Sequence, residues 1–156
     1  MAEIDTALHR QLGVELFNLV WDYLDKSERT PQENDTMLNA AHASRYHWEQ
    51  AGTALNLARG EWQISRVYAV LKRPEPARYH AARSLEICLT HGIGDFDLAF
   101  AYEALARASA VAGNYKESQK WFVQARQALQ SIQEEDDRAF VEKDLATIPA
   151  GPEGSE

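Results

Sequence analysis

Two arginines and a tryptophan recur on one side of the stretch "RGEWQISRVYAVL", residues 59–71. Arg59, Trp62 and Arg66 are spaced three and four residues apart, so they share one face of a helix. The apolar residues of the same stretch lie on another side: Ile64, Val67, Tyr68 and Leu71. Guanidinium groups bind carboxylates in a bidentate manner, and tryptophan offers a large apolar or cation–π surface. This face therefore predicts a site for an acidic group, with Trp62 packing beside it.

The histidines are the second group of residues that could do chemistry. Four of the five lie in the central part of the chain, close in sequence to acidic residues: His42, His47, His80 and His91, with Glu49, Glu61, Asp95 and Asp97. A metal site on a helix needs ligands that converge on one side, as at H-x-x-x-H or E-x-x-H spacing, and neither spacing occurs. We therefore expect structural histidines and no metal site. The alternative is a metal-binding protein or metal-dependent enzyme that uses His42, His47 and His80.

Other catalytic signals are sparse. The chain has no G-x-S-x-G, no phosphate-binding glycine loop and no paired-cysteine motif. Its single cysteine, Cys88, falls on the apolar face of a predicted helix, which indicates a packed thiol. The sequence thus favours a non-catalytic protein that needs no cofactor, although an enzyme stays open as the alternative.

Composition limits the compartment and the partners. One cysteine can form no intrachain disulfide, and the start "MAEIDTALHR" lacks the basic residues and apolar block of a secretory signal. No apolar run has the length of a membrane span. The formal net charge of −8 is unfavourable for binding nucleic acid or an anionic membrane. We therefore expect a cytoplasmic protein that binds neither nucleic acid nor membrane.

The elements that must position these residues are helices. The chain of 156 residues is 45% hydrophobic and poor in glycine and proline, which favours one all-α domain. Turn and capping signals predict about seven helices, near residues 5–25, 36–50, 54–72, 74–91, 96–112, 115–132 and 135–146. Asp35 or Thr36 is expected to cap the second helix, and Asn114 with Glu117 the sixth. The tail "TIPAGPEGSE", residues 147–156, has little to bury and is predicted to be disordered.

Two of these helices are related by an internal repeat. Shifting the sequence by 41 residues places "LARGEWQISRVYAV" (57–70) over "LAFAYEALARASAV" (98–111), with identities that include Arg66 and Arg107. A short break and a second helix rich in small residues follow each segment. The pattern therefore predicts a repeated helix–turn–helix unit.

The segment "YEALARASAVAGNYKESQKWFVQARQAL" (102–129) resembles the tetratricopeptide repeat family. The residues that carry the resemblance are Tyr102, Leu105 and Ala106 in the first helix, Gly113, Asn114 and Tyr115 in the turn, and Ser118, Phe122 and Ala125 in the second helix. Residues 61–88 follow the pattern more loosely. The resemblance covers residues 57–130 and extends to 5–52 by extrapolation.

This resemblance implies a fold of antiparallel helical hairpins, stacked as a short right-handed superhelix over residues 1–146. The units would lie near residues 5–52, 53–93 and 95–132, followed by a C-terminal helix near 135–146. In the family, the first helix of each unit lines a concave groove. The resemblance therefore places Arg59, Trp62 and Arg66 in this groove, together with Phe100, Glu103 and Arg107.

The function implied is a scaffold that binds a protein or peptide partner in the groove. The ligand would carry acidic groups or a free C-terminus, held by Arg59, Arg66 and Arg107. Three alternatives stay open: Arg66 pairs with Glu103 across the helix interface, Trp62 covers the seam between the first and third helices, or the first or seventh helix fills the groove. A homodimer formed by one of these two helices is a further alternative.

Overall fold

The computed structural model describes residues 2–152, and within this range the chain forms seven α-helices and no β-strand. The helices are α1 (Thr6–Leu24), α2 (Pro31–Ala51), α3 (Ala54–Val70), α4 (Pro74–Thr90), α5 (Asp95–Val111), α6 (Tyr115–Gln130) and α7 (Glu135–Leu145). The prediction of an all-α protein with about seven helices is confirmed.

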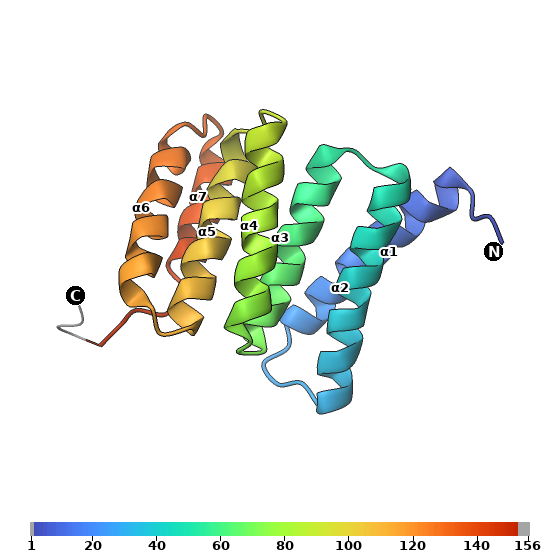
Figure 1. Cartoon of the computed structure of the whole chain (residues 1–156), viewed down its shortest axis with the longest axis horizontal. Coiled ribbons are helices and arrows are strands. Elements are labelled where there is room, and N and C mark those ends of the chain that lie inside the picture. The colour runs from blue at the N-terminus through green and yellow to red at the C-terminus, as the bar shows by residue number, and fades with distance from the viewer. Residues whose placement is uncertain (1, 153–156) are drawn as a thin grey trace.

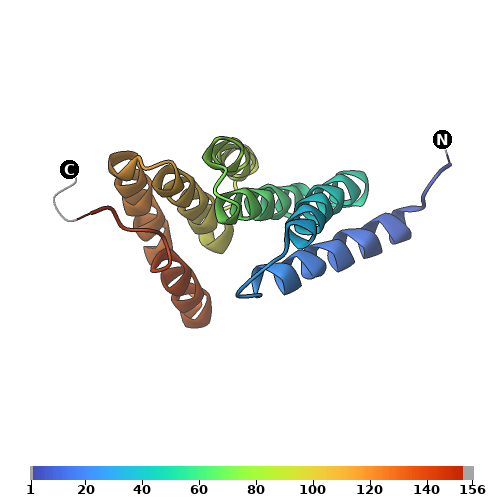
Figure 2. The same ribbon diagram turned by 90° about the horizontal axis from the view of Figure 1, so that it is seen from below.

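The helices pack as three antiparallel hairpins, α1–α2, α3–α4 and α5–α6, with α7 added at the C-terminal end (Figure 1). The first helices of the hairpins also contact one another, α1 with α3 and α3 with α5, and α7 contacts α5. Figure 2 shows α1 and α7 on the same side of α3, opposite α4. The residues of α3 and α5 on that side therefore lie between the two terminal helices.

Local capping chemistry explains where α1, α2 and α6 begin. The side chain of Asn114 accepts a hydrogen bond from the Glu117 backbone N–H, as expected for α6. The second helix, in contrast, begins at Pro31, earlier than the predicted start near residue 36. Thr30 and Glu33 form a capping box there, with Pro31 in the first turn, where a missing N–H is tolerated. This capping signal is in the sequence "TPQE", residues 30–33, upstream of the cap expected at Asp35 or Thr36.

Buried serines join the two helices of each hairpin. Their hydroxyls donate to backbone carbonyls of the facing helix in four pairs: Ser44 to Gly13, Ser65 to Ala77, Ser84 to Ala58, and Ser118 to Ala106. Small side chains let the helices approach closely, and each hydroxyl finds a partner inside the protein. At the α1–α2 crossing, Gly13 has no space for a side chain, because an added Cβ would lie 2.8 Å from the Trp48 ring.

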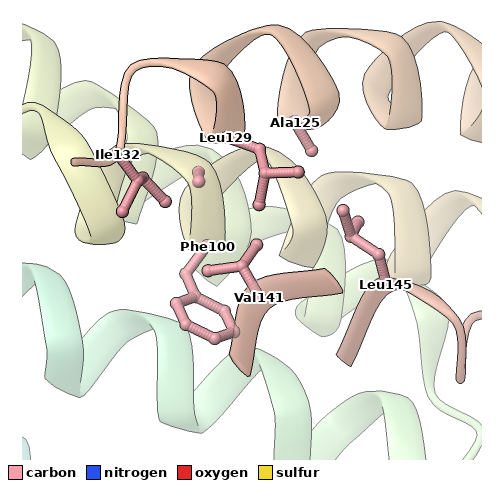
Figure 3. Close-up of a cluster of buried hydrophobic side chains, with 7 residues drawn as sticks. Phe100, Ala125, Leu129, Ile132, Val141 and Leu145 are labelled. Atoms are coloured by element: carbon pink, nitrogen blue, oxygen red, sulfur yellow. The ribbon is translucent and has the colours of Figure 1, made fainter. Parts of the chain in front are cut away.

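Separate apolar clusters fill the spaces between hairpins. At the N-terminal end, Val20, Met37, Ile64 and Val67 are fully buried between α1, α2 and α3. At the C-terminal end, α5, α6 and α7 enclose another cluster, shown in Figure 3: Ala99, Phe100, Ala125, Leu129, Ile132, Val141 and Leu145. The short helix α7 thus belongs to the packed core through Val141 and Leu145.

Candidate functional site

Glu103 of α5 is the centre of a buried charge cluster. One of its carboxylate oxygens, Oε1, accepts hydrogen bonds from Arg66 Nη2 and Arg107 Nε, both at 2.8 Å, and Oε2 accepts one from Trp62 Nε1 at 3.0 Å. Glu103 has no exposed surface. Burial by itself would raise the pKa of this carboxyl, but the two arginines hold it below its usual value. Trp62 and Arg66 of the predicted face therefore meet Glu103, whereas Arg59 does not reach it. The expected alternative, an Arg66–Glu103 ion pair, is confirmed.

The C-terminal helix α7 covers both of these arginines. Asp144 of α7 forms an ion pair with Arg66. Arg107 Nη2 donates to the Asp144 carbonyl at 3.0 Å and to Thr147 Oγ1 at 2.7 Å. Burial and the charge of Glu103 raise the pKa of Asp144 despite the nearby arginines. Arg66 and Arg107 are thus neutralised by groups of the chain itself, so α7 occupies this part of the expected groove.

Arg59 differs from the other two arginines. Its Nε and Nη2 donate to the two carboxylate oxygens of Asp97 at 2.8 and 3.1 Å, a bidentate pair between α3 and α5. The Arg59 side chain is nevertheless 48% exposed. Its Nη1 has no hydrogen-bond partner among residues 2–152. This guanidinium therefore keeps donors that can reach a ligand.

An open pocket of about 240 Å³ lies beside Arg59. We call it the aromatic pocket, and it is lined by Phe17 and Trp21 of α1, Ala58, Arg59 and Trp62 of α3, Phe96, Asp97 and Phe100 of α5, and Phe140 of α7. The Trp62 ring lies 5.7 Å from the Trp21 ring and 5.3 Å from the Phe100 ring, between centroids. Trp62 therefore bridges α1 and α3, as one of the alternatives expected, and it also forms a wall of the pocket.

A smaller cavity of about 140 Å³ adjoins the aromatic pocket. It shares Phe17 and Arg59 with that pocket, and its other lining residues are Val14, Asn18, Trp48 and Asn56. Together the two cavities form a groove along α1 and α3. The amides of Asn18 and Asn56 lie in the smaller part of this groove, aromatic rings line both parts, and Arg59 is shared by them.

Sequence reasoning found Arg59, Trp62 and Phe100 of this pocket, but not its other lining residues. Phe17 with Trp21 and Phe96 with Phe100 are pairs four residues apart, which places each pair on one helix face. The spacing alone therefore indicates an aromatic face on the first and on the fifth helix. Phe140 gave no comparable signal, because a single ring on a short acidic helix does not indicate where the helix docks.

A larger hollow of about 1110 Å³ lies between the first half of α6 and residues 148–152. It is lined by the first half of α6 and by Ile148 and residues 149–152, and the latter have no regular secondary structure. It contains none of the predicted site residues. The smaller aromatic pocket is the better candidate site, because converging rings and an arginine line it.

Four of the five histidines form two separate pairs, and His91 belongs to neither. His42 Nε2 lies 2.9 Å from the Tyr68 hydroxyl, and the His42 and His80 rings lie 5.5 Å apart. His80 Nδ1 lies 2.6 Å from Oε2 of the buried Glu61, whose Oε1 accepts a hydrogen bond from Arg45 Nε. Partial burial and the charge of His80 lower the pKa of His42.

His47 lies apart from His42 and His80, and its Nδ1 faces His9 Nδ1 at 2.8 Å. Burial and His9 lower the pKa of His47 as well. Within residues 2–152 the structure brings no three histidine, cysteine or acidic side chains into an arrangement that could hold a metal ion. The alternative metal set therefore separates into a pair and a single residue.

Cys88 is buried, and burial raises the pKa of its thiol to about 11. The thiol is therefore protonated at neutral pH and is a poor nucleophile.

In the described part of the chain, no helix is both long enough and apolar enough to span a membrane. Comparisons with protein-family models, curated proteins and solved structures found no match.

Proposed function

We propose that this chain is a non-catalytic scaffold that binds a segment of a partner protein in the groove along α1 and α3. The observation that carries the proposal is the open aromatic pocket. Six aromatic side chains from α1, α3, α5 and α7 line it, and Arg59 lies at its edge. Aromatic residues and arginine are the types most enriched at binding hot spots.

The size of the pocket supports a side chain as its occupant. Pockets for drug-sized molecules and cofactors usually measure about 300–1,000 Å³. The aromatic pocket, with about 240 Å³, lies below this range. It suits a single large side chain as an anchor, with the rest of the segment lying along the adjoining cavity.

The expected acidic group or free C-terminus of the ligand would be held by Arg59. Arg66 and Arg107 have carboxylates of the chain as partners. The charge of Arg59 is balanced by Asp97 on one edge only, and its exposed side remains available.

We also propose that the protein is a tetratricopeptide-like repeat with a right-handed superhelix, and that it acts in the cytoplasm.

Selection from a random peptide display library tests the proposal. Peptides enriched on the unmodified protein should bind Phe140→Ala at least tenfold more weakly, because removing one aromatic contact of about 1.4 kcal/mol corresponds to that factor. Phe140 is 54% exposed, so this variant should fold. Tyr79→Ala, which removes an aromatic side chain of α4 that is 62% exposed, is the matched control and should bind as the unmodified protein does. Failure to enrich any peptide that is sensitive to Phe140→Ala contradicts the proposal.

A further inference from the structure

We propose that the anchor bound in the aromatic pocket is an uncharged aromatic ring accompanied by a carboxylate. The ring would lie between Trp21, Trp62 and Phe140, and the carboxylate would bind the exposed edge of Arg59. This inference rests on the proposed function and specifies the class of ligand that the same site takes.

Rings grouped around a pocket often bind a cation, and the local charges argue against that here. The Arg66 guanidinium already lies over the Trp62 ring, 5.1 Å from its centroid. Arg59 lies at the pocket edge, and the carboxylate of Asp97 is already held by it in a bidentate pair. A bound ammonium group would therefore lie beside Arg59, on a Trp62 ring that Arg66 already contacts, and would find no unpaired carboxylate in the pocket lining. A neutral ring, in contrast, gains edge-to-face and offset contacts without that repulsion.

The unused donor of Arg59 is the reason to expect a carboxylate on the ligand. A guanidinium can bind two carboxylates at once, because its N–H donors point along more than one edge. Asp97 uses Nε and Nη2, and Nη1 has no partner within residues 2–152. Because Arg59 lines both cavities of the groove, a carboxylate can reach it from beside a ring in the aromatic pocket.

The chain itself contains a segment of this kind. In α7, the Phe140 ring contacts the rings of Phe96 and Phe100, with centroids 6.1 and 5.8 Å away. Four residues later, Asp144 pairs with Arg66. An aromatic ring and a carboxylate of one segment thus bind rings and an arginine of α3 and α5. The open part of the groove repeats this combination with Trp62 and Arg59.

A titration with three small indoles tests the inference. The probes are indole-3-propionate, indole-3-propionamide and tryptamine, which differ in charge but share the ring. Their binding is followed by NMR through the indole N–H signals of the four tryptophans. We expect the signals of Trp21 and Trp62 to shift and that of Trp121, which lies outside the pocket, to stay in place. The propionate should bind at least tenfold more tightly than tryptamine.

Variants of two arginines separate the role of charge. Arg59→Gln should bring the affinity for the propionate down to that for the propionamide. Arg83→Gln, which changes a partly exposed arginine of α4 paired with Glu86, should leave all three affinities unchanged. Equal binding of the three probes, tighter binding of tryptamine, or no binding at millimolar concentration overturns the inference. None of these results affects the peptide-display test, so the proposed function can survive the loss of this inference.

The ring and the carboxylate could belong to a segment of a partner protein or to a small aromatic acid, and a short peptide compared with indole-3-propionate distinguishes these two sources. Acetyl-Gly-Trp-Asp-Gly-amide binding more tightly than indole-3-propionate assigns the site to a segment of a partner protein. Tighter binding of the free acid assigns it to a small aromatic acid and contradicts a partner-protein segment as the occupant. The Trp-Asn version of the peptide is the control, and its binding as tightly as the Trp-Asp version contradicts the role of the carboxylate.

Discussion

Glu103 is a buried acid that joins side chains of two helices in the interior of this protein. It is fully buried, and three side chains from α3 and α5 donate hydrogen bonds to its carboxylate. Removing one member of a buried ion pair is costly, because the remaining charges lose their partner and stay out of water. The carboxylate therefore compensates two arginines that would otherwise be strongly destabilising.

Glu103→Gln should lower the free energy of unfolding by about 3–5 kcal/mol, since the amide keeps the shape but leaves Arg66 and Arg107 without that charge. Urea denaturation measures the change. Glu86→Gln removes the charge of an exposed acid, 64% exposed and paired with Arg83, and should change stability by less than about 0.5 kcal/mol. Similar effects of the two substitutions would contradict the role of Glu103.

The histidine cluster predicts a loss of stability in mild acid. The pKa of His42 is lower in the folded protein than its unfolded value of about 6.5, so the unfolded chain binds more protons below that pH. The contribution of neutral His42 to stability is thus fully present above pH 6.5, and it is lost as the pH drops through the pKa of His42 in the folded protein. The pKa of Glu61, which His80 and Arg45 hold below 4.5 despite its burial, adds a further loss below pH 4.5.

The urea midpoint at pH 7.5 and pH 5.5 measures the first of these effects. His42→Gln should reduce the decrease in the midpoint between the two pH values. His91→Gln changes an exposed histidine at the end of α4 and should leave the decrease as it is. A decrease of unchanged size in His42→Gln would show that His42 is not its source.

Among the elements, α7 has the least local support. It has 11 residues, the fewest among the described helices, and no side chain caps its start. An isolated helix of this length is marginal in water, so its stability must come from packing. Val141 and Leu145 supply the apolar contacts, and the arginines of α3 and α5 hold its C-terminal end. Docking of α7 also completes the aromatic pocket through Phe140.

Asp144→Asn should loosen α7 without unfolding the protein, because the ion pair with Arg66 is weakened and the apolar contacts remain. Amide hydrogen exchange should become at least several-fold faster in residues 135–145 and stay unchanged in α2 and α4. Asp136→Asn, in the first turn of α7, is the control and should leave exchange near residue 144 as it is. Uniform acceleration throughout the chain would argue against local docking.

At the scale of the whole molecule, each hairpin contacts only its neighbours along the row. The α1–α2 hairpin meets α3 but neither α5 nor α6, and α7 packs against α5 and α6 and forms one ion pair with Arg66 of α3. In such an arrangement, stability is approximately a sum over units and the contacts between them. Damage at one end is therefore expected to stay near that end.

Gly13→Ala tests this expectation. An added methyl would lie 2.8 Å from the Trp48 ring. This overlap should lower the free energy of unfolding by about 1–3 kcal/mol, despite the better helix propensity of alanine. Hydrogen exchange should accelerate in α1 and α2 but not in α5 to α7. Gly60→Ala, also within a helix, meets the Arg45 side chain at 3.1 Å and should cost at least about 1 kcal/mol less, because that side chain can move.

The sequence by itself determined the helices, because periodicity and capping are local. Apolar spacing within each segment, Asn114 with Glu117, and the shift of 41 residues were sufficient to predict an all-α chain with a repeated hairpin. It also placed Arg59, Trp62 and Arg66 on one face and offered Glu103 as a partner for Arg66. The start of α2 differed only because an equally local signal, Thr30 with Glu33, stands further upstream.

Only the tertiary structure decided which charges remain available to a ligand. Arg59, Arg66 and Arg107 carry the same group, but Asp144 and Thr147 cover two of them because α7 docks on α5. The aromatic pocket joins Phe17 to Phe140 across four helices that are distant in the chain. Such contacts depend on the angles and depth of helix packing, which many side chains set together, and no local pattern encodes them.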